Sequence, residues 1–299
     1  MYSSFNARAL GLTLSTRETI DLAAAAGFGG VDFLMRELRA EAVDPKVVRS
    51  RLDDLGLRAG AWSLPVDWRG DADRFTHDLE QLSRYAEAAA VLGAVRTGTW
   101  VLPEQLALTG PDGGRPTSSK LAATVELHVQ RLGAIARVLA NHGVRLGLEV
   151  IGVESFRSGR EVPFVTRLSE LDRQLGVLWQ ESANFGILLD GFHLYAGGEA
   201  IEAGFAWGVD QIVWVHVADL PASAPSDRAA IQDHDRGLPG ENGAIDTAQL
   251  LKRLAEAGYS GPVTAEPGAK CRSIEGRSAQ EIARLVASAM TAVWPQPTP

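Results

Sequence analysis

Four short apolar runs in the second half of the chain each lead to a side chain that can bind a metal ion. The runs are RLGLEV, FGILLD, IVWVHV and PVTAE, and the side chains are Glu149, Asp190, His216 and Glu266, spaced 26 to 50 residues apart. Three carboxylates and one imidazole suit a hard or borderline divalent cation, Mn²⁺ or Mg²⁺ foremost, with Co²⁺ or Zn²⁺ also compatible. Since the set contains no thiolate, we expect a catalytic metal ion rather than a closed structural zinc site.

A single acidic residue at the end of a strand is commonly a helix cap or an ion-pair partner, so none of these residues alone identifies a metal site. The four together carry more weight. Three carboxylates gathered at one opening without a cation would repel one another strongly. The set therefore predicts metal binding.

The apolar runs show no polar alternation, which is typical of parallel strands covered on both faces. Stretches with apolar residues at spacings of three and four, typical of helices, separate them. We expect eight strands, at 4–7, 30–34, 58–62, 94–99, 144–150, 186–190, 211–217 and 262–266, and helices near 16–26, 44–55, 71–92, 119–142, 165–175 and 247–257. This order predicts a single (β/α)₈ barrel, the TIM barrel, whose active site forms at the carboxyl ends of the strands.

Length and turn chemistry agree with that architecture. A chain of 299 residues is long enough for one barrel of about 250 residues, so we place a single domain over 1–299 with a frayed tail at about 294–299. Ser15 and Glu18 form a capping-box pattern, and Gly27 and Gly258 follow two of the helices.

Composition restricts the function classes. With 45% hydrophobic and 22% charged residues, the chain has the makeup of an ordinary globular protein. No stretch approaches the roughly 20 apolar residues that span a bilayer, and the start does not resemble a secretion signal. The net charge of −8 argues against a broad nucleic-acid surface, and the lone Cys271 is expected to be a packing residue. A cytoplasmic protein without a membrane partner fits these features.

Two further side chains are candidate substrate contacts. His193 follows Asp190 in DGFH, a spacing that lets Asp190 hold metal while His193 donates to a substrate oxygen; the alternative is a loop histidine with other partners. Arg236 lies in the long segment after the seventh strand, beside Gly237, Pro239 and Gly240. Those turn formers either shape a surface loop or fold it inward and place the guanidinium over a substrate.

The sequence resembles the xylose-isomerase-like barrel superfamily, in particular the sugar phosphate isomerases and epimerases, which include ketose 3-epimerases, hydroxypyruvate isomerases and inosose dehydratases. The resemblance covers nearly the whole chain, from SFNARALGL and AAAAGFGGVDF to GYSGPVTAEP. Its most specific parts are LEV with Glu149, LDGFH, HVAD, RGLPGENGAID and AEP with Glu266.

By analogy with the ketose 3-epimerases, Glu149 and Glu266 would be metal ligands and also the acid/base pair, and Asp190 and His216 would complete the metal site. His193, Arg236 and Glu154 would contact the substrate. The sequence departs from those epimerases in one respect: no Arg lies six residues beyond His216, and Arg236 comes only after an inserted segment. Paired barrels are common among such proteins, so a homo-oligomer is compatible with the resemblance.

The implied chemistry is proton abstraction next to a carbonyl of a small sugar or polyol. A divalent ion acidifies the adjacent C–H and stabilises the enediolate. Proton return to the other face gives epimerisation, and return to the neighbouring carbon gives isomerisation. Loss of a β-hydroxyl from a keto-inositol or a 3-keto sugar would make the protein a dehydratase, so three outcomes stay open.

Two other classes compete with a sugar enzyme. An endonuclease IV type of DNA repair enzyme needs several zinc ions and further histidines at early strand ends, where this chain has Trp62, Ser63, Thr99 and Trp100. Its histidines at 77, 128 and 142 are expected at helix surfaces. A non-catalytic sugar-binding barrel would have no need of the Glu149 and Glu266 pair.

The remaining candidate substrate contacts each have two interpretations. Trp62, Trp68, Trp100 and Phe192 lie near strand ends and form either an apolar wall against a sugar or part of the core. Arg157 and Arg160 are read as solvated charges rather than as a phosphate site.

Overall fold

Eight parallel strands close into a barrel in the order in which they occur along the chain. The structure is a computed structural model, and it describes residues 1–106 and 117–296. The strands are β1 (Tyr2–Phe5), β2 (Gly30–Phe33), β3 (Arg58–Ser63), β4 (Arg96–Trp100), β5 (Arg145–Glu149), β6 (Phe185–Asp190), β7 (Ile212–Val217) and β8 (Pro262–Ala265). The prediction of a (β/α)₈ barrel is confirmed. The first strand begins two residues earlier than expected, and the fourth begins two residues later.

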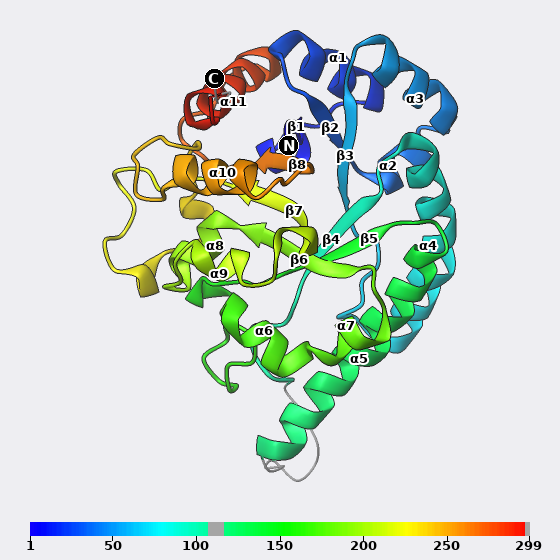
Figure 1. Ribbon diagram of the computed structural model, residues 1–299, viewed down its shortest axis with the longest axis vertical. Helices are drawn as coiled ribbons and strands as arrows, with labels where there is room; N and C mark the ends of the chain where they lie inside the picture. The colour runs from blue at the N-terminus through cyan, green and yellow to red at the C-terminus, as the bar shows by residue number, and fades with distance from the viewer. Residues whose placement is uncertain (107–116, 297–299) are drawn as a thin grey trace.

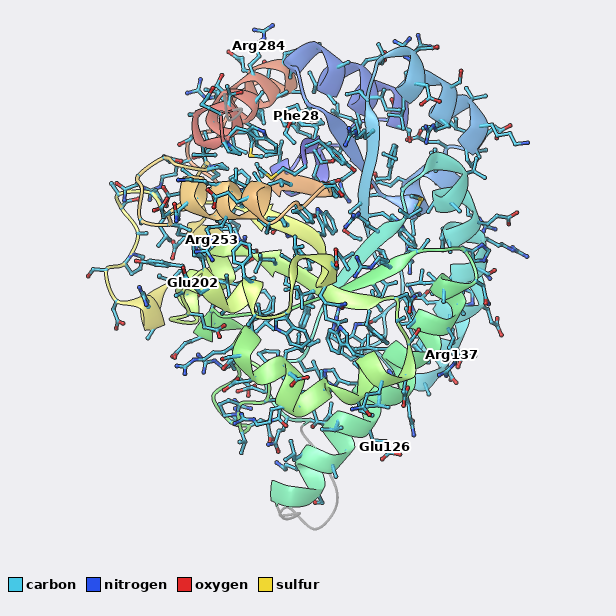
Figure 2. The ribbon with its side chains drawn as sticks, in the orientation of Figure 1. Phe28, Glu126, Arg137, Glu202, Arg253 and Arg284 are labelled. Atoms are coloured by element: carbon cyan, nitrogen blue, oxygen red, sulfur yellow. The ribbon has the colours of Figure 1, made fainter. Side chains whose placement is uncertain are left out.

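Helices surround the barrel (Figure 1). They are α1 (Thr16–Ala26), α2 (Met35–Ala40), α3 (Pro45–Asp54), α4 (Ala72–Leu92), α5 (Thr117–Ala140), α6 (Leu168–Leu175), α7 (Val177–Glu181), α8 (Gly191–Ala196), α9 (Glu202–Phe205), α10 (Thr247–Glu256) and α11 (Ala279–Val293). The C-terminal helix α11 packs beside α1, so the last and the first helix close the ring. Charged side chains such as Glu126, Arg137 and Arg284 point outward from it (Figure 2).

Local sequence explains where α1 begins and ends. The Ser15 side chain accepts a hydrogen bond from the Glu18 backbone, and the Glu18 carboxylate accepts one from the Ser15 backbone, as the capping-box pattern predicted. Gly27 ends the helix at a φ of 83°, a left-handed conformation that side chains with a Cβ disfavour. β2 then starts at Gly30, only three residues later.

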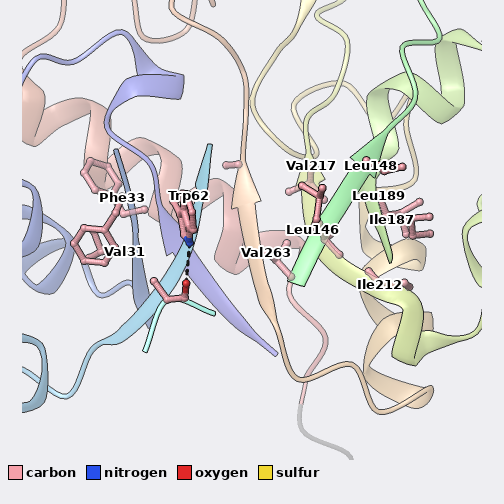
Figure 3. Close-up of a cluster of buried hydrophobic side chains, with 14 of the residues drawn as sticks. Val31, Phe33, Trp62, Leu146, Leu148, Ile187, Leu189, Ile212, Val217 and Val263 are labelled. Atoms are coloured by element: carbon pink, nitrogen blue, oxygen red, sulfur yellow. Dashed lines mark hydrogen bonds between the residues drawn. The ribbon is translucent and has the colours of Figure 1, made fainter. Parts of the chain in front are cut away.

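Alternation along the strands divides the core into two layers. Leu146, Leu148, Ile187 and Leu189 belong to the large cluster between barrel and helices, part of which is shown in Figure 3. Leu188, one position out of phase, belongs instead to a small separate cluster with Ala61 and Trp214. Since neighbouring residues of a strand point to opposite faces, this second cluster fills the barrel interior.

The end of the chain is described as far as residue 296, so positions 297–299 of the expected frayed tail lie outside the described residues. Trp294 packs, partly buried, against the large cluster. Within the described residues, no helix combines the length and apolar character needed to cross a membrane.

Candidate metal and substrate site

The four predicted metal ligands come together at the carboxyl ends of β5 to β8. Glu149 and Asp190 are the last residues of β5 and β6, His216 is the penultimate residue of β7, and Glu266 directly follows β8. One potential ligand atom from each side chain lies within 4.8 Å of the others. Among the described residues, no other group of three or more His, Cys, Asp and Glu side chains gathers in this way. Within the described residues, no further histidine from the early strands joins the cluster, as a nuclease with several zinc ions would require.

His216 lies between the two glutamates. Its Nδ1 atom is 3.0 Å from a Glu266 carboxylate oxygen and 3.6 Å from a Glu149 oxygen. The approach to Glu266 lacks hydrogen-bond geometry, so neither buried ring nitrogen of His216 has a hydrogen-bond partner among the described residues. Burial without a partner is unfavourable for an imidazole nitrogen, and a metal bond would satisfy one of the two.

Asp190 divides its two carboxylate oxygens between two tasks. Oδ1 accepts a hydrogen bond from the Phe192 backbone and so caps α8, the short helix that begins directly after β6. Oδ2 faces the cluster and lies 2.8 Å from an Arg236 guanidinium nitrogen. Asp190 is thus both a helix cap and a member of the cluster, two roles that the sequence presented as alternatives.

Arg236 folds inward over the site and is only 5% exposed. Its guanidinium contacts Asp190 at 2.8 Å and Glu266 at 3.4 Å, and it donates to Asp233 at 2.9 and 3.1 Å. The central carbon of the guanidinium lies over the Phe192 ring, 4.3 Å from its centroid, a cation–π arrangement. Of the two readings of this loop, the structure has the inward one.

His193 joins the same group from α8. Its Nε2 atom lies 3.0 Å from an Arg236 nitrogen, and its Nδ1 atom is buried without a hydrogen-bond partner among the described residues. The side chain borders a cavity that Glu149, Arg236 and Glu266 also line. It is therefore placed where a substrate oxygen could reach it.

Burial and neighbouring charges compete to set the pKa values of the cluster. Burial raises the pKa of Asp190, but Arg236 and the two histidines more than offset this and hold it well below its usual range. Burial likewise opposes ionisation of Glu266, yet His216 and Arg236 lower its pKa. Burial lowers the pKa of His216, and the carboxylates of Glu266 and Glu149 outweigh this and raise it well above 6.5. For Glu149, burial dominates and raises the pKa.

These residues fit a divalent metal ion. Three carboxylates gather beside one imidazole, and Asp233 places a fourth acidic group next to Arg236. The oxygen and nitrogen donors are those that Mn²⁺, Mg²⁺, Co²⁺ and Zn²⁺ accept, and the two ring nitrogens of His216 without hydrogen bonds are consistent with a metal bond.

A cavity of about 330 Å³ opens above the cluster, within the size range of small-ligand sites. Its polar lining residues are Glu149, His193, Asp233, His234, Arg236, Glu266 and Lys270, and the others are Ala9, Trp100, Ile151, Phe156, Gly268 and Ala269. Trp100 packs edge-on against Phe156, with ring centroids 5.9 Å apart, and the two form an aromatic side of the cavity. On Trp100 itself lies the guanidinium of Arg69, 3.8 Å from the ring centroid, which holds the indole in place.

Of the four aromatic residues considered for a cavity wall, Trp100 is the one that lines it. Trp62 and Trp68 are fully buried in the core, where their indole nitrogens donate to the Ala94 carbonyl, as Figure 3 shows, and to the Thr99 hydroxyl. Phe192 is also fully buried and packs beneath Arg236.

Glu154 lies away from the cluster. It is exposed in a short 3₁₀ turn (Glu154–Phe156) and pairs with Arg157 at 2.8 Å. It is not among the described residues that line the cavity, and its substrate role stays a prediction from the resemblance. Arg160 is exposed.

The expectation for His128 was wrong. His77 is exposed and His142 half-buried, but His128 is fully buried between Trp68 and Phe164. Its ring bonds to the Thr124 carbonyl and accepts from the Leu102 backbone. Position in a helix does not decide exposure; the face does, and His128 lies on the core-facing side of α5.

Sequence reasoning missed Asp219, which anchors the loop that carries Arg236. Its carboxylate accepts hydrogen bonds from four backbone amides, those of Leu220, Asn242, Gly243 and Ile245, at 2.6 to 2.9 Å. Its backbone pairs with Gly237, the residue after Arg236. The signal was present in HVAD, where an acidic residue follows a buried strand with no cation nearby in the sequence.

The closed sheet of eight parallel strands and the surrounding helices define a (β/α)₈ barrel. The candidate site lies at the carboxyl ends of the strands, the face where such barrels have their active sites. Residues 20–288 match the xylose isomerase-like TIM barrel family. The chain belongs to this family, as the sequence motifs predicted.

Relatives and a solved structure extend this result. A 3-dehydroshikimate dehydratase of Pseudomonas putida is 29% identical over 251 residues, which cover 83% of this chain and 35% of that protein. An inosose isomerase of Halalkalibacterium halodurans is 30% identical over 146 residues, covering 46% of this chain and 44% of that protein. A xylose isomerase domain protein from Alicyclobacillus acidocaldarius has a TM-score of 0.79 and 26% identity, with 97% of each chain covered. This chain therefore spans about a third of the dehydratase and under half of the isomerase, and both of these relatives are enzymes.

Proposed function

We propose that the chain is a divalent-metal-dependent enzyme that removes a proton next to a carbonyl group of a small polyhydroxylated substrate. The observation that carries the proposal is the convergence of Glu149, Asp190, His216 and Glu266 within 4.8 Å. Two of them, Glu149 and Glu266, line a cavity of small-molecule size. Glu149, Asp190, His216 and Glu266 would hold the metal ion. When bound, such an ion polarises a carbonyl and stabilises the negative charge of an enediolate.

The protein's own side chains then have distinct tasks. Glu149 and Glu266 come from two different strand ends and approach the same His216 nitrogen, so one can take the substrate proton while the other returns it, as general acid–base catalysis requires. His193 and Arg236 border the cavity and carry N–H groups that orient substrate oxygens. Trp100 and Phe156 exclude water from one side and offer an aromatic surface to C–H groups.

Isomerisation or epimerisation is the outcome that a pair of acid/base glutamates supports best. Two carboxyls placed on different strands can act at two positions or two faces of a planar intermediate, whereas a single base suffices for proton removal alone. The inosose isomerase similarity agrees with this outcome.

Dehydration is the second candidate, because a relative whose similarity covers 83% of this chain is a 3-dehydroshikimate dehydratase. It uses the same first step. Glu149 or Glu266 removes the proton, and the opposite carboxyl, once protonated, donates a proton to the departing β-hydroxyl so that it leaves as water.

One experiment separates these outcomes. The Mn²⁺-loaded protein is incubated in D₂O with ketoses, inososes and 3-dehydroshikimate, and NMR follows deuterium incorporation and products. An isomer containing deuterium identifies an isomerase or epimerase, and an unsaturated product with loss of water identifies a dehydratase. Glu149→Gln should abolish both, and Glu256→Gln, an exposed carboxyl on α10, serves as control. Exchange at the parent rate in Glu149→Gln would refute the acid/base assignment.

A further inference from the structure

Directly beneath the candidate metal site lies a layer of inward-facing side chains that the proposed reaction does not use. Trp214 and Thr264 precede His216 and Glu266 by two residues, so they share the same inner face of β7 and β8 one step deeper in the barrel. Thr264 is fully buried, and Trp214 is 2% exposed. Contacts that fix the positions of Trp214 and Thr264 therefore also influence the positions of His216 and Glu266.

Asp32 on β2 is the centre of this layer. Its carboxylate is buried and accepts three hydrogen bonds, from the Ser4 hydroxyl at 2.6 Å, the Thr264 hydroxyl at 2.6 Å and the Ala61 backbone at 2.9 Å. No ion pair joins it to a described Lys or Arg side chain within 4.0 Å. A carboxylate buried without a cation is unfavourable unless hydrogen bonds compensate it.

The fold provides dedicated space for this carboxylate. A Cβ atom on Gly60 would lie 2.1 Å from Asp32 Oδ1 and 2.3 Å from the Ser4 hydroxyl, so no side chain fits there. At Gly98, a Cβ atom would lie 3.2 Å from the Trp214 ring and 2.6 Å from Leu188. Two glycines of the barrel wall thus leave room for the two largest polar members of the layer.

Hydrogen bonds run through the layer, and a ring contact joins it to the site. The Trp214 indole N–H donates to the Thr264 hydroxyl at 2.9 Å, and that hydroxyl donates its own proton to Asp32 Oδ2. The Trp214 ring meets the His216 ring edge-on, with centroids 4.4 Å apart and an interplanar angle of 81°. Thr264 therefore fixes the indole against which the His216 imidazole packs.

We propose that Asp32, Thr264 and Trp214 form a positioning layer that orients the His216 ring and the Glu266 end of β8 for metal binding. The proposal rests on the metal site of the proposed function and concerns residues that touch neither metal nor substrate. Groups behind the ligands commonly set metal affinity, because they fix the direction in which a ligand points.

The central hydroxyl offers a direct test. Thr264→Val keeps the shape of the side chain but removes the acceptor of the Trp214 N–H and one donor to Asp32. Thr264→Ser keeps the hydroxyl and loses only a methyl group. Thr97→Val is the matched control, since Thr97 is a fully buried strand residue whose hydroxyl donates at 2.7 Å to the Trp62 carbonyl and makes no hydrogen bond to Asp32, Thr264 or Trp214.

The readout is Co²⁺ binding, measured by calorimetry and by the visible absorption spectrum of the bound ion, which responds to ligand geometry and needs no substrate. We expect Thr264→Val to weaken Co²⁺ binding about 10-fold or more and to change the spectrum, as changes behind metal ligands do. Thr264→Ser and Thr97→Val should keep the parent affinity and spectrum. If Thr264→Val does not fold, Asp32→Asn replaces it, and it should weaken binding in the same direction, because its amide N–H competes with Trp214 for the Thr264 oxygen.

Three results would overturn the proposal. The first is a parent-like Co²⁺ affinity and spectrum in folded Thr264→Val, or in Asp32→Asn where that variant replaces it. The second is an equal loss of Co²⁺ affinity in Thr264→Ser and Thr264→Val. A parent protein that binds no Co²⁺ would refute the metal site itself. If instead the parent binds Co²⁺ and Thr264→Val loses it, but no substrate in the panel exchanges deuterium, the positioning layer stands and the proposed reaction fails.

Discussion

Replacing Asp219 by Asn should release the loop that presents Arg236. The carboxylate is fully buried, Oδ1 accepts from Leu220 and Ile245, and Oδ2 accepts from Asn242 and Gly243. Asn keeps one acceptor oxygen and turns the other into an N–H donor. Two of the four backbone donors therefore lose their partner and face another donor.

The magnitude follows from those two amides. Leaving a buried donor without a partner costs about 1–3 kcal/mol, so we expect Asp219→Asn to lower the free energy of unfolding by about 2–6 kcal/mol. Asp44→Asn is the control. Asp44 is exposed and caps α3 by accepting from Lys46, and since Asn and Asp are comparable caps, this change should have little effect on stability.

The assays are urea unfolding and hydrogen exchange read by mass spectrometry. In Asp219→Asn, peptides covering residues 237–246 should exchange faster, while strand peptides of β4 to β6 keep the parent pattern and Co²⁺ still binds. Turnover should fall because Arg236 is attached to this loop through Gly237. A loss of stability below about 1 kcal/mol together with unchanged exchange of the loop would refute the anchoring role.

Three other predictions follow from the site and the core. Arg236→Ala should reduce kcat/KM for any substrate by at least about 10-fold, a loss of about 1.4 kcal/mol, with metal content retained, measured by steady-state kinetics and metal analysis; loss of metal would contradict the placement of the loop. Addition of Mn²⁺ at 100 times its Kd should stabilise the chelator-treated parent by about 2.7 kcal/mol in thermal or urea unfolding, and Glu149→Gln should lose most of that gain. Burial lowers the pKa of His128 to about 4 from 6.5, so the unfolded chain binds the proton first as pH falls. The stability it contributes is therefore complete above pH 6.5 and is lost towards pH 4, by about 2 kcal/mol between pH 8 and pH 5. His128→Gln should remove that part of the pH dependence of urea unfolding, and an unchanged slope would contradict it.

The barrel and the convergence of four candidate ligands could be predicted because the same constraint produces both. A parallel strand buried on two faces reads as an uninterrupted apolar run, and an acidic residue or His that ends such a run is conspicuous. Glu149, Asp190 and His216 were found in this way, and so was Glu266. The starts of β1 and β4 were each misplaced by two residues, since residues such as Ser4 and Ala94 fit a strand or its flank equally well.

Helices that follow a strand directly were harder to find. α8 begins immediately after Asp190, so its six residues carry too little periodicity to identify, and only the Asp190 cap marks them. α11 did carry signals that were overlooked: a capping box of Ser278 and Glu281, and buried residues at helical spacing such as Ile282 and Val286. The same spacing would have placed His128 on the buried face, because it lies four residues after the buried Thr124 and four before Leu132.

The residues that sequence reasoning missed share one property, which is that their partners are backbone amides or hydroxyls, most of them more than 20 residues away in the sequence. Asp219 binds amides 23 to 26 residues away, and Asp32 receives a hydroxyl from Thr264, 232 residues along the chain. Neither has the cationic neighbour or the ligand spacing that makes a carboxylate stand out. One signal is still visible in the sequence: an acidic residue lies inside or just after an apolar strand, as in GVDF and HVAD. Such a residue requires hydrogen-bond donors that its own strand cannot supply. In a closed barrel those donors come from the neighbouring strands, or from a loop folded back over the strand ends. Such a residue therefore indicates where the barrel has been built to hold something in position.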